Sequence, residues 1–85
     1  MGKKPLKPAP TLDLHGFTVD EVFDAVEAFL RKHANSPRVR IMHGKGTGKV
    51  KAKVLEYLKL ANYPCKPERM DNGQTNDGVL VVFME

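Results

Sequence analysis

The sequence predicts a two-layer α/β sandwich, in which a mixed four-stranded sheet carries two helices on one face. This prediction depends on two observations. Short segments typical of strands alternate with two amphipathic segments typical of helices, in the order β-α-β-α-β-β. If the first two strands run in one direction, right-handed crossovers place both helices on the same face of the sheet. The length of 85 residues suits one small domain.

The first part of the chain predicts an arm, a strand and a helix. Residues 1–10 hold three lysines and three prolines without hydrophobic periodicity, and we expect a basic flexible arm or linker. Residues 11–15 predict a short strand. Thr18 and Glu21 form the pattern of a capping box, and apolar residues then recur at helical spacing as far as His33.

A second strand and a second helix follow. Residues 38–43 alternate, with apolar side chains on one face and Arg38 and Arg40 on the other. Residues 49–61 carry one apolar stripe at helical spacing, which predicts a helix with one buried face.

Two more strands complete the predicted sheet. Residues 65–70 alternate and contain Pro67, which cannot donate a ladder hydrogen bond, so they predict an edge strand. Residues 71–78 are rich in Asn, Gly and Asp and predict a turn. Residues 79–84 are apolar on both faces, which indicates a covered, central strand.

Charge is distributed unevenly along a chain whose net charge is +4. Residues 18–33 hold four acidic side chains, whereas residues 38–59 hold seven basic side chains against one glutamate. This segregation favours a polyanionic partner such as nucleic acid on one side of the domain. On charge alone, a solvated lysine-rich face is an equally good interpretation.

Cysteine usage and hydropathy indicate the compartment. The single cysteine, Cys65, excludes an internal disulfide and fits a reducing environment. Its apolar neighbours indicate a buried small side chain rather than a nucleophile. Apolar runs are too short for a membrane span or a signal peptide. We therefore expect a cytoplasmic monomer with no membrane partner.

The Leu-Asp-Leu-His-Gly sequence at residues 12–16 carries the first candidate site. Asp13 and His15 are two positions apart, so in a strand their side chains share one face. An imidazole with a pKa near 6.5 can donate or accept a proton at neutral pH. A nearby carboxylate can orient that imidazole or bind a metal ion. Taken alone, the pair is more typical of a strand end at which Asp13 accepts hydrogen bonds from loop amides.

The His-Gly-Lys-Gly-Thr-Gly sequence at residues 43–48 carries the second candidate site. Its three alternating glycines permit positive φ and a close backbone approach, and their amides precede a predicted helix amino terminus. Such a loop favours an anion, to which Lys45 adds a positive charge. Neighbouring parallel strands end at the same edge of a sheet, so we expect His15 and His43 to face each other as general base and general acid.

Lysines at the start of the predicted second helix conflict with the helix dipole. Each opposes it by about 0.3–1 kcal/mol, and such local conflicts are typical of functional sites, where a bound anion offsets them. Arg38 and Arg40 can add contacts from the open face of the sheet. His33, Tyr57 and Tyr63 fit structural roles. The predicted phosphate- or nucleic-acid-binding residues are Gly44, Lys45, Gly46, Thr47, Gly48, Lys49, Lys51, Lys53, Arg38 and Arg40.

Two familiar nucleotide-binding loops do not fit. A Walker A loop ending at Gly48 and Lys49 needs glycine where His43 stands. The dinucleotide-binding fingerprint needs glycine in place of Lys49. We therefore expect no ATP or nicotinamide cofactor.

The two motifs, in this order and separation, resemble those of the Smr (small MutS-related) domain, and the resemblance extends over residues 11–83. We accordingly expect one Smr domain at residues 11–85. The resemblance implies a two-layer α/β sandwich like the carboxyl-terminal domain of bacterial translation initiation factor three. It also implies binding of DNA or RNA, and endonuclease activity that nicks DNA or cleaves messenger RNA, in some members on stalled ribosomes.

The resemblance also carries residue roles. It implicates Asp13 and His15 in cleavage, and His43 with the three residues that follow it in binding or cleaving the backbone. Many members have a Gly-Gly-x-Gly loop before the last strand, whereas this chain has Asn76-Asp77-Gly78. Gly78 is the only clear match to that loop, so we give little weight to a functional role for it.

The sequence thus predicts a nucleic-acid endonuclease. His15 and His43 share proton transfer, Asp13 orients His15, and Lys45 with the amides of residues 44–48 holds the phosphate. RNA supplies its own 2′-hydroxyl nucleophile and requires no metal, whereas DNA requires water and favours a divalent ion at Asp13. The absence of a second carboxylate near Asp13 in the sequence favours RNA. The alternatives are a non-catalytic module that binds nucleic acid or ribosomes, and an adaptor that docks through the apolar last strand.

Overall fold

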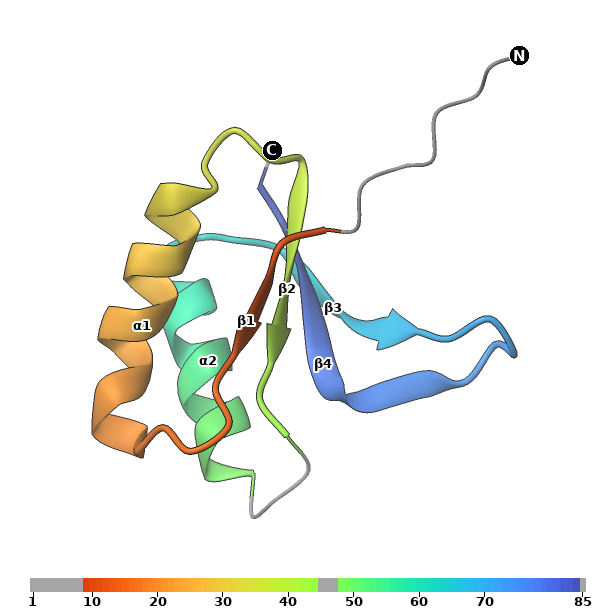
Figure 1. The fold of residues 1–85 in the computed structure, drawn as a ribbon, viewed down its shortest axis with the longest axis horizontal. Coiled ribbons are helices and arrows are strands. Elements are labelled where there is room, and N and C mark those ends of the chain that lie inside the picture. The colour runs from red at the N-terminus through yellow and green to blue at the C-terminus, as the bar shows by residue number, and fades with distance from the viewer. Residues whose placement is uncertain (1–8, 45–47, 85) are drawn as a thin grey trace.

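Two helices cover one face of a four-stranded sheet in the computed structural model, which describes residues 9–44 and 48–84 (Figure 1). The predicted fold class and element order are confirmed. Most of the predicted arm, together with Lys45, Gly46 and Thr47, lies outside the described residues. The elements are β1 (Thr11–Asp13), α1 (Val19–Lys32), β2 (Arg38–Met42), α2 (Lys49–Leu60), β3 (Cys65–Arg69) and β4 (Thr75–Phe83).

The sheet has the strand order β1-β2-β4-β3. β1 and β2 are parallel, as the predicted crossover requires, and β4 runs antiparallel to both of its neighbours, β2 and β3. β4 is therefore a central strand, as its apolar sequence predicts, but it is not fully covered, because Val81 and Phe83 on the face opposite the helices are partly exposed. The strand that contains Pro67 lies at an edge, where a missing donor leaves no ladder bond unmade.

The first helix forms where its capping pattern predicts. Glu21 Oε1 accepts a hydrogen bond from the amide of Thr18 at 2.8 Å, which satisfies a donor just outside the helix. The side chains of Val22, Val26 and Leu30 recur at four-residue spacing and are buried against the sheet. The helix thus begins and ends within one residue of its predicted bounds.

The core lies between the helices and the sheet. Val39 and Ile41 of β2 and Val54 of α2 are fully buried, and Leu58 is 1% exposed. Each such side chain contributes roughly 1.5–3 kcal/mol of hydrophobic stabilisation. Tyr57, Tyr63 and Cys65 pack against this cluster, so their structural interpretation is confirmed. Burial also raises the pKa of the Cys65 thiol, which makes it a poor nucleophile at neutral pH.

The last strand is longer than predicted. β4 begins at Thr75, whereas the sequence predicts a turn as far as residue 78 and a strand from residue 79. Residues 71–74 alone make the turn, closed by a 2.7 Å hydrogen bond from the amide of Met70 to the carbonyl of Gln74. The hairpin of β3 and β4 extends beyond the helices (Figure 1), so polar residues there can form a strand without burying a face.

None of the described helices is both long enough and apolar enough to span a membrane.

Candidate active site

The two sequence motifs lie next to each other at one edge of the sheet. β1 and β2 are adjacent parallel strands, with Asp13 paired to Met42 in register. The amide of Leu14 continues this ladder by donating to the carbonyl of Met42 at 2.9 Å. The turn after β1 and the turn after β2 therefore leave the sheet side by side, as the sequence predicts (Figure 1).

Asp13 and His15 form the accessible part of this edge. Both residues are exposed. Asp13 Oδ1 accepts a hydrogen bond from the amide of His15 at 2.9 Å, which closes a tight turn at the strand end. Asp13 thus contacts the backbone of His15, whereas we predicted an interaction with its ring. Among the described residues, none donates a hydrogen bond to the other carboxylate oxygen of Asp13.

His43 is buried, in contrast to the accessible general acid that the sequence predicts. His43 is 8% exposed, because it continues the alternation along β2 that buries Val39 and Ile41. Nδ1 lies 2.8 Å from the carbonyl oxygen of Gly44, which fixes Nδ1 as the donor and leaves Nε2 unprotonated in the neutral ring. Nε2 has no hydrogen-bond partner among the described residues.

Electrostatics keep the His43 ring neutral. Burial lowers its pKa from the ordinary value of 6.5, the hydrogen bond to the Gly44 carbonyl partly offsets this, and the positive charge of Lys51 lowers the pKa by a smaller amount. The effect of Lys51 also places the first turn of α2 near this imidazole. His15 and His43 are therefore not equivalent: one is exposed to solvent, and the other is a neutral buried ring.

The turn after β2 requires glycine at both of its described ends. Gly44 has φ of +81° and Gly48 has φ of +87°, a region that other residues rarely adopt. Gly48 precedes α2 directly, and its carbonyl accepts the first helical hydrogen bond from Ala52 at 2.9 Å. The first turn of α2 contains no acidic residue, so its amides and the exposed Lys51 present positive charge.

Gly78 has a structural role that the sequence analysis missed. Its carbonyl oxygen accepts from the amide of His43 at 2.9 Å and from that of Gly44 at 3.1 Å. The amide of Gly44 is therefore already bonded within the domain, whereas the predicted phosphate cradle uses this amide as a donor to the anion; binding by Gly44 stays a prediction. Asn76 Oδ1 in turn accepts from the amide of Gly78 at 3.1 Å. The match of Gly78 to the family's loop was the signal for this contact.

Several predicted binding residues are engaged within the domain. Lys53 lies 3.3 Å from Glu56 and over the ring of Phe23, on the helix surface. Arg40 projects from the open face of the sheet, as predicted, but it forms a bidentate ion pair with Glu68.

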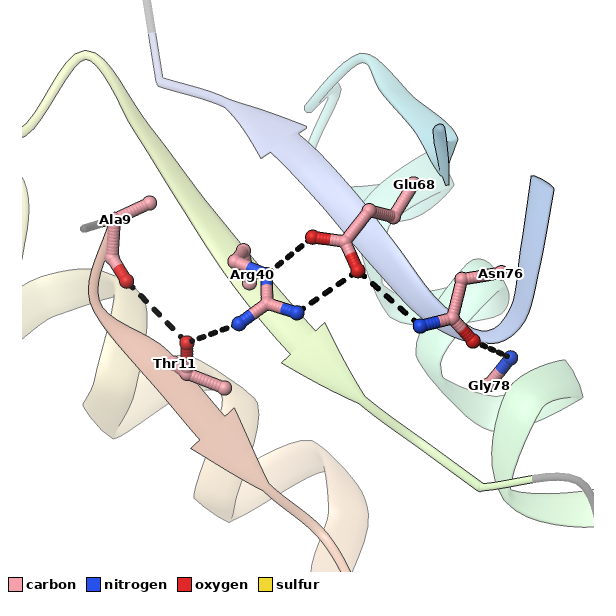
Figure 2. Close-up of polar contacts among 6 residues, drawn as sticks. All are labelled: Ala9, Thr11, Arg40, Glu68, Asn76 and Gly78. Carbon is pink, nitrogen blue, oxygen red and sulfur yellow. Dashed lines mark hydrogen bonds and ion pairs between the residues drawn. The ribbon is translucent and has the colours of Figure 1, made fainter. Parts of the chain in front are cut away.

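Arg40 joins strands across the open face. Its Nη1 donates to Thr11 Oγ1 of β1 at 3.1 Å, and its Nη2 donates to Glu68 of β3 at 2.8 Å (Figure 2). Glu68 also accepts from Asn76 Nδ2 at 3.3 Å, so the network reaches the residue that holds Gly78. The guanidinium lowers the pKa of the Glu68 carboxyl, and the carboxylate raises the pKa of Arg40.

Metal binding at Asp13 stays a prediction. In the part of the chain that the structure describes, no three His, Cys, Asp or Glu side chains come together as a metal site. Asp13 with its one free carboxylate oxygen fits an ion that is held mostly by water and substrate phosphate, as Mg²⁺ often is.

Comparison with known proteins identifies the fold's relatives. The Smr domain family matches residues 12–85. The chain is 41% identical over 75 residues to endonuclease MutS2 of Symbiobacterium thermophilum, which covers 86% of this chain and 10% of that protein. It is 40% identical over 76 residues to endonuclease MutS2 of Bacillus cytotoxicus, covering 87% and 10%. The chain thus spans about a tenth of the length of these relatives.

Two solved structures resemble the fold. The crystal structure of the Smr domain of Thermus thermophilus MutS2 matches with a TM-score of 0.75 and 27% identity, over 91% of this chain and 99% of that one. The solution structure of the Smr domain of NEDD4-binding protein 2 matches with a TM-score of 0.59 and 21% identity, over 99% and 94%, and supports the fold alone. On the extent of the family match and these identities, the chain belongs to the Smr domain family.

Proposed function

We propose that the domain binds nucleic acid and cleaves its phosphodiester backbone at the edge where β1 and β2 end. The observation that carries the proposal is the exposed Asp13 and His15 pair, held in one turn at the end of β1, next to the end of β2. The family relatives named as endonucleases support the same reaction.

In this proposal the two imidazoles have different roles. His15 is exposed and transfers the proton. His43 is neutral and buried, and its contact with Gly44 shapes the turn that leads to α2. The amides at the start of α2, together with Lys51, hold the phosphate, because the first-turn amides of a helix have no partner within the helix.

RNA is the substrate that fits these groups without a further nucleophile. The neutral ring of His15 takes the proton of the 2′-hydroxyl, and the 2′-oxygen attacks phosphorus. The bond from phosphorus to the 5′-oxygen breaks, and that oxygen takes a proton from water. The products are a 2′,3′-cyclic phosphate and a 5′-hydroxyl end. Positive charge at α2 stabilises the additional negative charge that develops on the phosphate.

The test incubates the purified chain with end-labelled RNA and with duplex DNA, each with and without EDTA. We expect RNA cleavage that persists in EDTA and leaves cyclic phosphate ends. Asp13→Asn preserves the acceptor for the His15 amide but removes the charge, and we expect it to slow cleavage. His33→Ala is the matched control, because it removes an imidazole at the end of α1, outside the site. The absence of product from every reaction contradicts the proposal.

A non-catalytic nucleic-acid-binding module is the second candidate. The observations that favour it are the burial of His43, which makes one of the two predicted acid–base groups inaccessible, and the hydrogen bond that the amide of His15 donates to Asp13. The same assay separates the two candidates. A non-catalytic binding module binds the RNA in an anisotropy titration but forms no cleavage product.

A further inference from the structure

The open face of the sheet contains a broad hollow that lies outside the candidate active site. It encloses about 720 Å³ on the side opposite the helices, over β2, β3 and β4. It does not include Asp13, His15 or the turn after β2. The hollow is open to solvent, and its volume lies within the range of known ligand sites.

The strand register separates the hollow into a floor and two walls. The central strand β4 supplies Val81 and Phe83, which are partly exposed and form an apolar floor. Arg38 of β2 pairs with Phe83, and Lys66 of β3 pairs with Val81. Residues paired in register project on the same face, so cations border the floor on both sides. β2 and β3, on either side of β4, lie two strand spacings apart, roughly 10 Å.

The cations of the walls are not neutralised within the domain. Among the residues that line the hollow, Glu68 supplies the carboxylate, and this carboxylate already forms an ion pair with Arg40 (Figure 2). Arg38, Lys66 and Arg69 are exposed, and they form no side-chain hydrogen bond or ion pair with any described residue. Three uncompensated positive charges thus surround an apolar strip, which is complementary to a polyanion that also exposes flat apolar groups.

We propose that this hollow binds a single-stranded segment of the nucleic acid, a proposal that rests on the function proposed above. Bases stack on Phe83 and contact Val81, while Arg38, Lys66 and Arg69 contact the phosphates. Aromatic side chains in a positively charged groove bind single strands in this way. A duplex directs its bases inward and presents phosphates, so it leaves the apolar floor uncovered.

Asp13 of the candidate active site lies on the same face of the sheet as the hollow. Side chains on the open face of β4 alternate, so Val79 is the next one from Val81 in the direction away from Phe83. Val79 pairs with Met42 of β2, and Met42 pairs with Asp13 of β1. These rows lie two residues apart along the strand, roughly 6.6–6.8 Å. Val79 is 2% exposed, so a nucleic-acid strand bound in the hollow must pass over this buried position and across β2 to reach Asp13 on β1.

The experiment measures fluorescence anisotropy with labelled single-stranded 12-mers of RNA and of DNA, and with a duplex of the same sequence. The variant Lys66→Glu/Arg69→Glu reverses two wall charges. The control Lys32→Glu/Lys59→Glu makes the same charge change at the ends of the helices, on the other side of the sheet. We expect the wall variant to weaken single-strand binding at least tenfold more than the control does. For the wall variant, the magnitude of the slope of log K against log salt concentration should decrease by about 1.4, because two phosphate contacts are lost.

The floor is tested separately. Phe83→Leu removes the ring and should weaken single-strand binding about fivefold or more, whereas Phe83→Tyr preserves stacking and should bind like the wild type. Thermal unfolding verifies that each variant is folded. Equal affinities of the wall variant and the control, or of Phe83→Leu and Phe83→Tyr, overturn the proposal. Cleavage by the wall variant at saturating concentration reports on the active site independently, so failure of this inference and failure of the proposed nuclease are distinguishable.

Discussion

The ion pair between Arg40 and Glu68 makes a quantitative prediction about stability. Glu68→Gln removes the charge but preserves the shape of the side chain. The two side chains are 29% and 23% exposed, and Glu68 accepts from both Arg40 and Asn76. A buried charge-assisted hydrogen bond contributes roughly 1.5–3 kcal/mol, and a fully exposed pair about 0.2–1 kcal/mol. We expect an intermediate loss of about 1–2 kcal/mol, or about 5–15 °C in Tm for a domain of this size.

The sign of the pH dependence follows from the lowered pKa of Glu68. The carboxyl of the folded state has a pKa below its ordinary value of 4.5. The pair therefore contributes its full stability above pH 4.5, and this contribution is lost as the pH falls through the folded-state pKa. The difference between the wild type and Glu68→Gln should be present in full at pH 7 and should become smaller as the pH falls below 4.5.

Urea unfolding, followed by circular dichroism, measures both effects. Glu56→Gln is the matched control, because it removes the charge from the ion pair between Glu56 and Lys53, which is more exposed than the pair between Arg40 and Glu68. We expect this control to lower the free energy of unfolding by less than about 0.5 kcal/mol. A Glu68→Gln variant as stable as this control at pH 7, or a difference that persists unchanged at pH 3, refutes the reasoning. Because the variant also frees Arg40, it should bind single strands more tightly than the wild type does.

Three further predictions concern the turn that holds His43. Burial lowers the pKa of His43, so the free energy of unfolding should decrease as the pH is lowered from 6.5, by at most about 1.4 kcal/mol per pH unit. His43→Gln should flatten this pH dependence, and urea titrations at several pH values measure it. Gly48→Ala and Gly73→Ala both place alanine at positive φ and should each cost about 1–2 kcal/mol, but only Gly48→Ala should also slow cleavage; equal rates contradict this. Asn76→Ala removes the acceptor of the partly buried Gly78 amide and should cost about 1–2 kcal/mol, whereas Asn72→Ala in the exposed hairpin turn should cost less, as thermal unfolding will show.

Local sequence patterns predicted most of the fold. The capping residues Thr18 and Glu21 located the start of α1, and alternation in residues 38–43 located β2 and its two faces. Pro67 identified an edge strand, because the missing donor limits where such a strand can lie. These features are determined by neighbours within a few residues, so a single sequence contains the information needed to place them.

Features that depend on distant contacts were less accessible. Asn76 and Gly78 read as turn residues by composition, yet pairing with β3 extends β4 through them. The burial of His43 followed from the alternation of β2, but the glycines after it suggested an exposed loop instead. The pairing of Arg40 with Glu68 joins residues 28 positions apart, which periodicity cannot reveal.

The measurement that tests the catalytic role of His15 most directly is single-turnover RNA cleavage by His15→Ala at a protein concentration that saturates the substrate. General acid–base catalysis contributes about 10²–10⁴-fold. We predict that the variant binds RNA within twofold of the wild type and cleaves it at least 100-fold more slowly. Cleavage by His15→Ala at the wild-type rate would show that the exposed pair at the end of β1 does not perform the reaction.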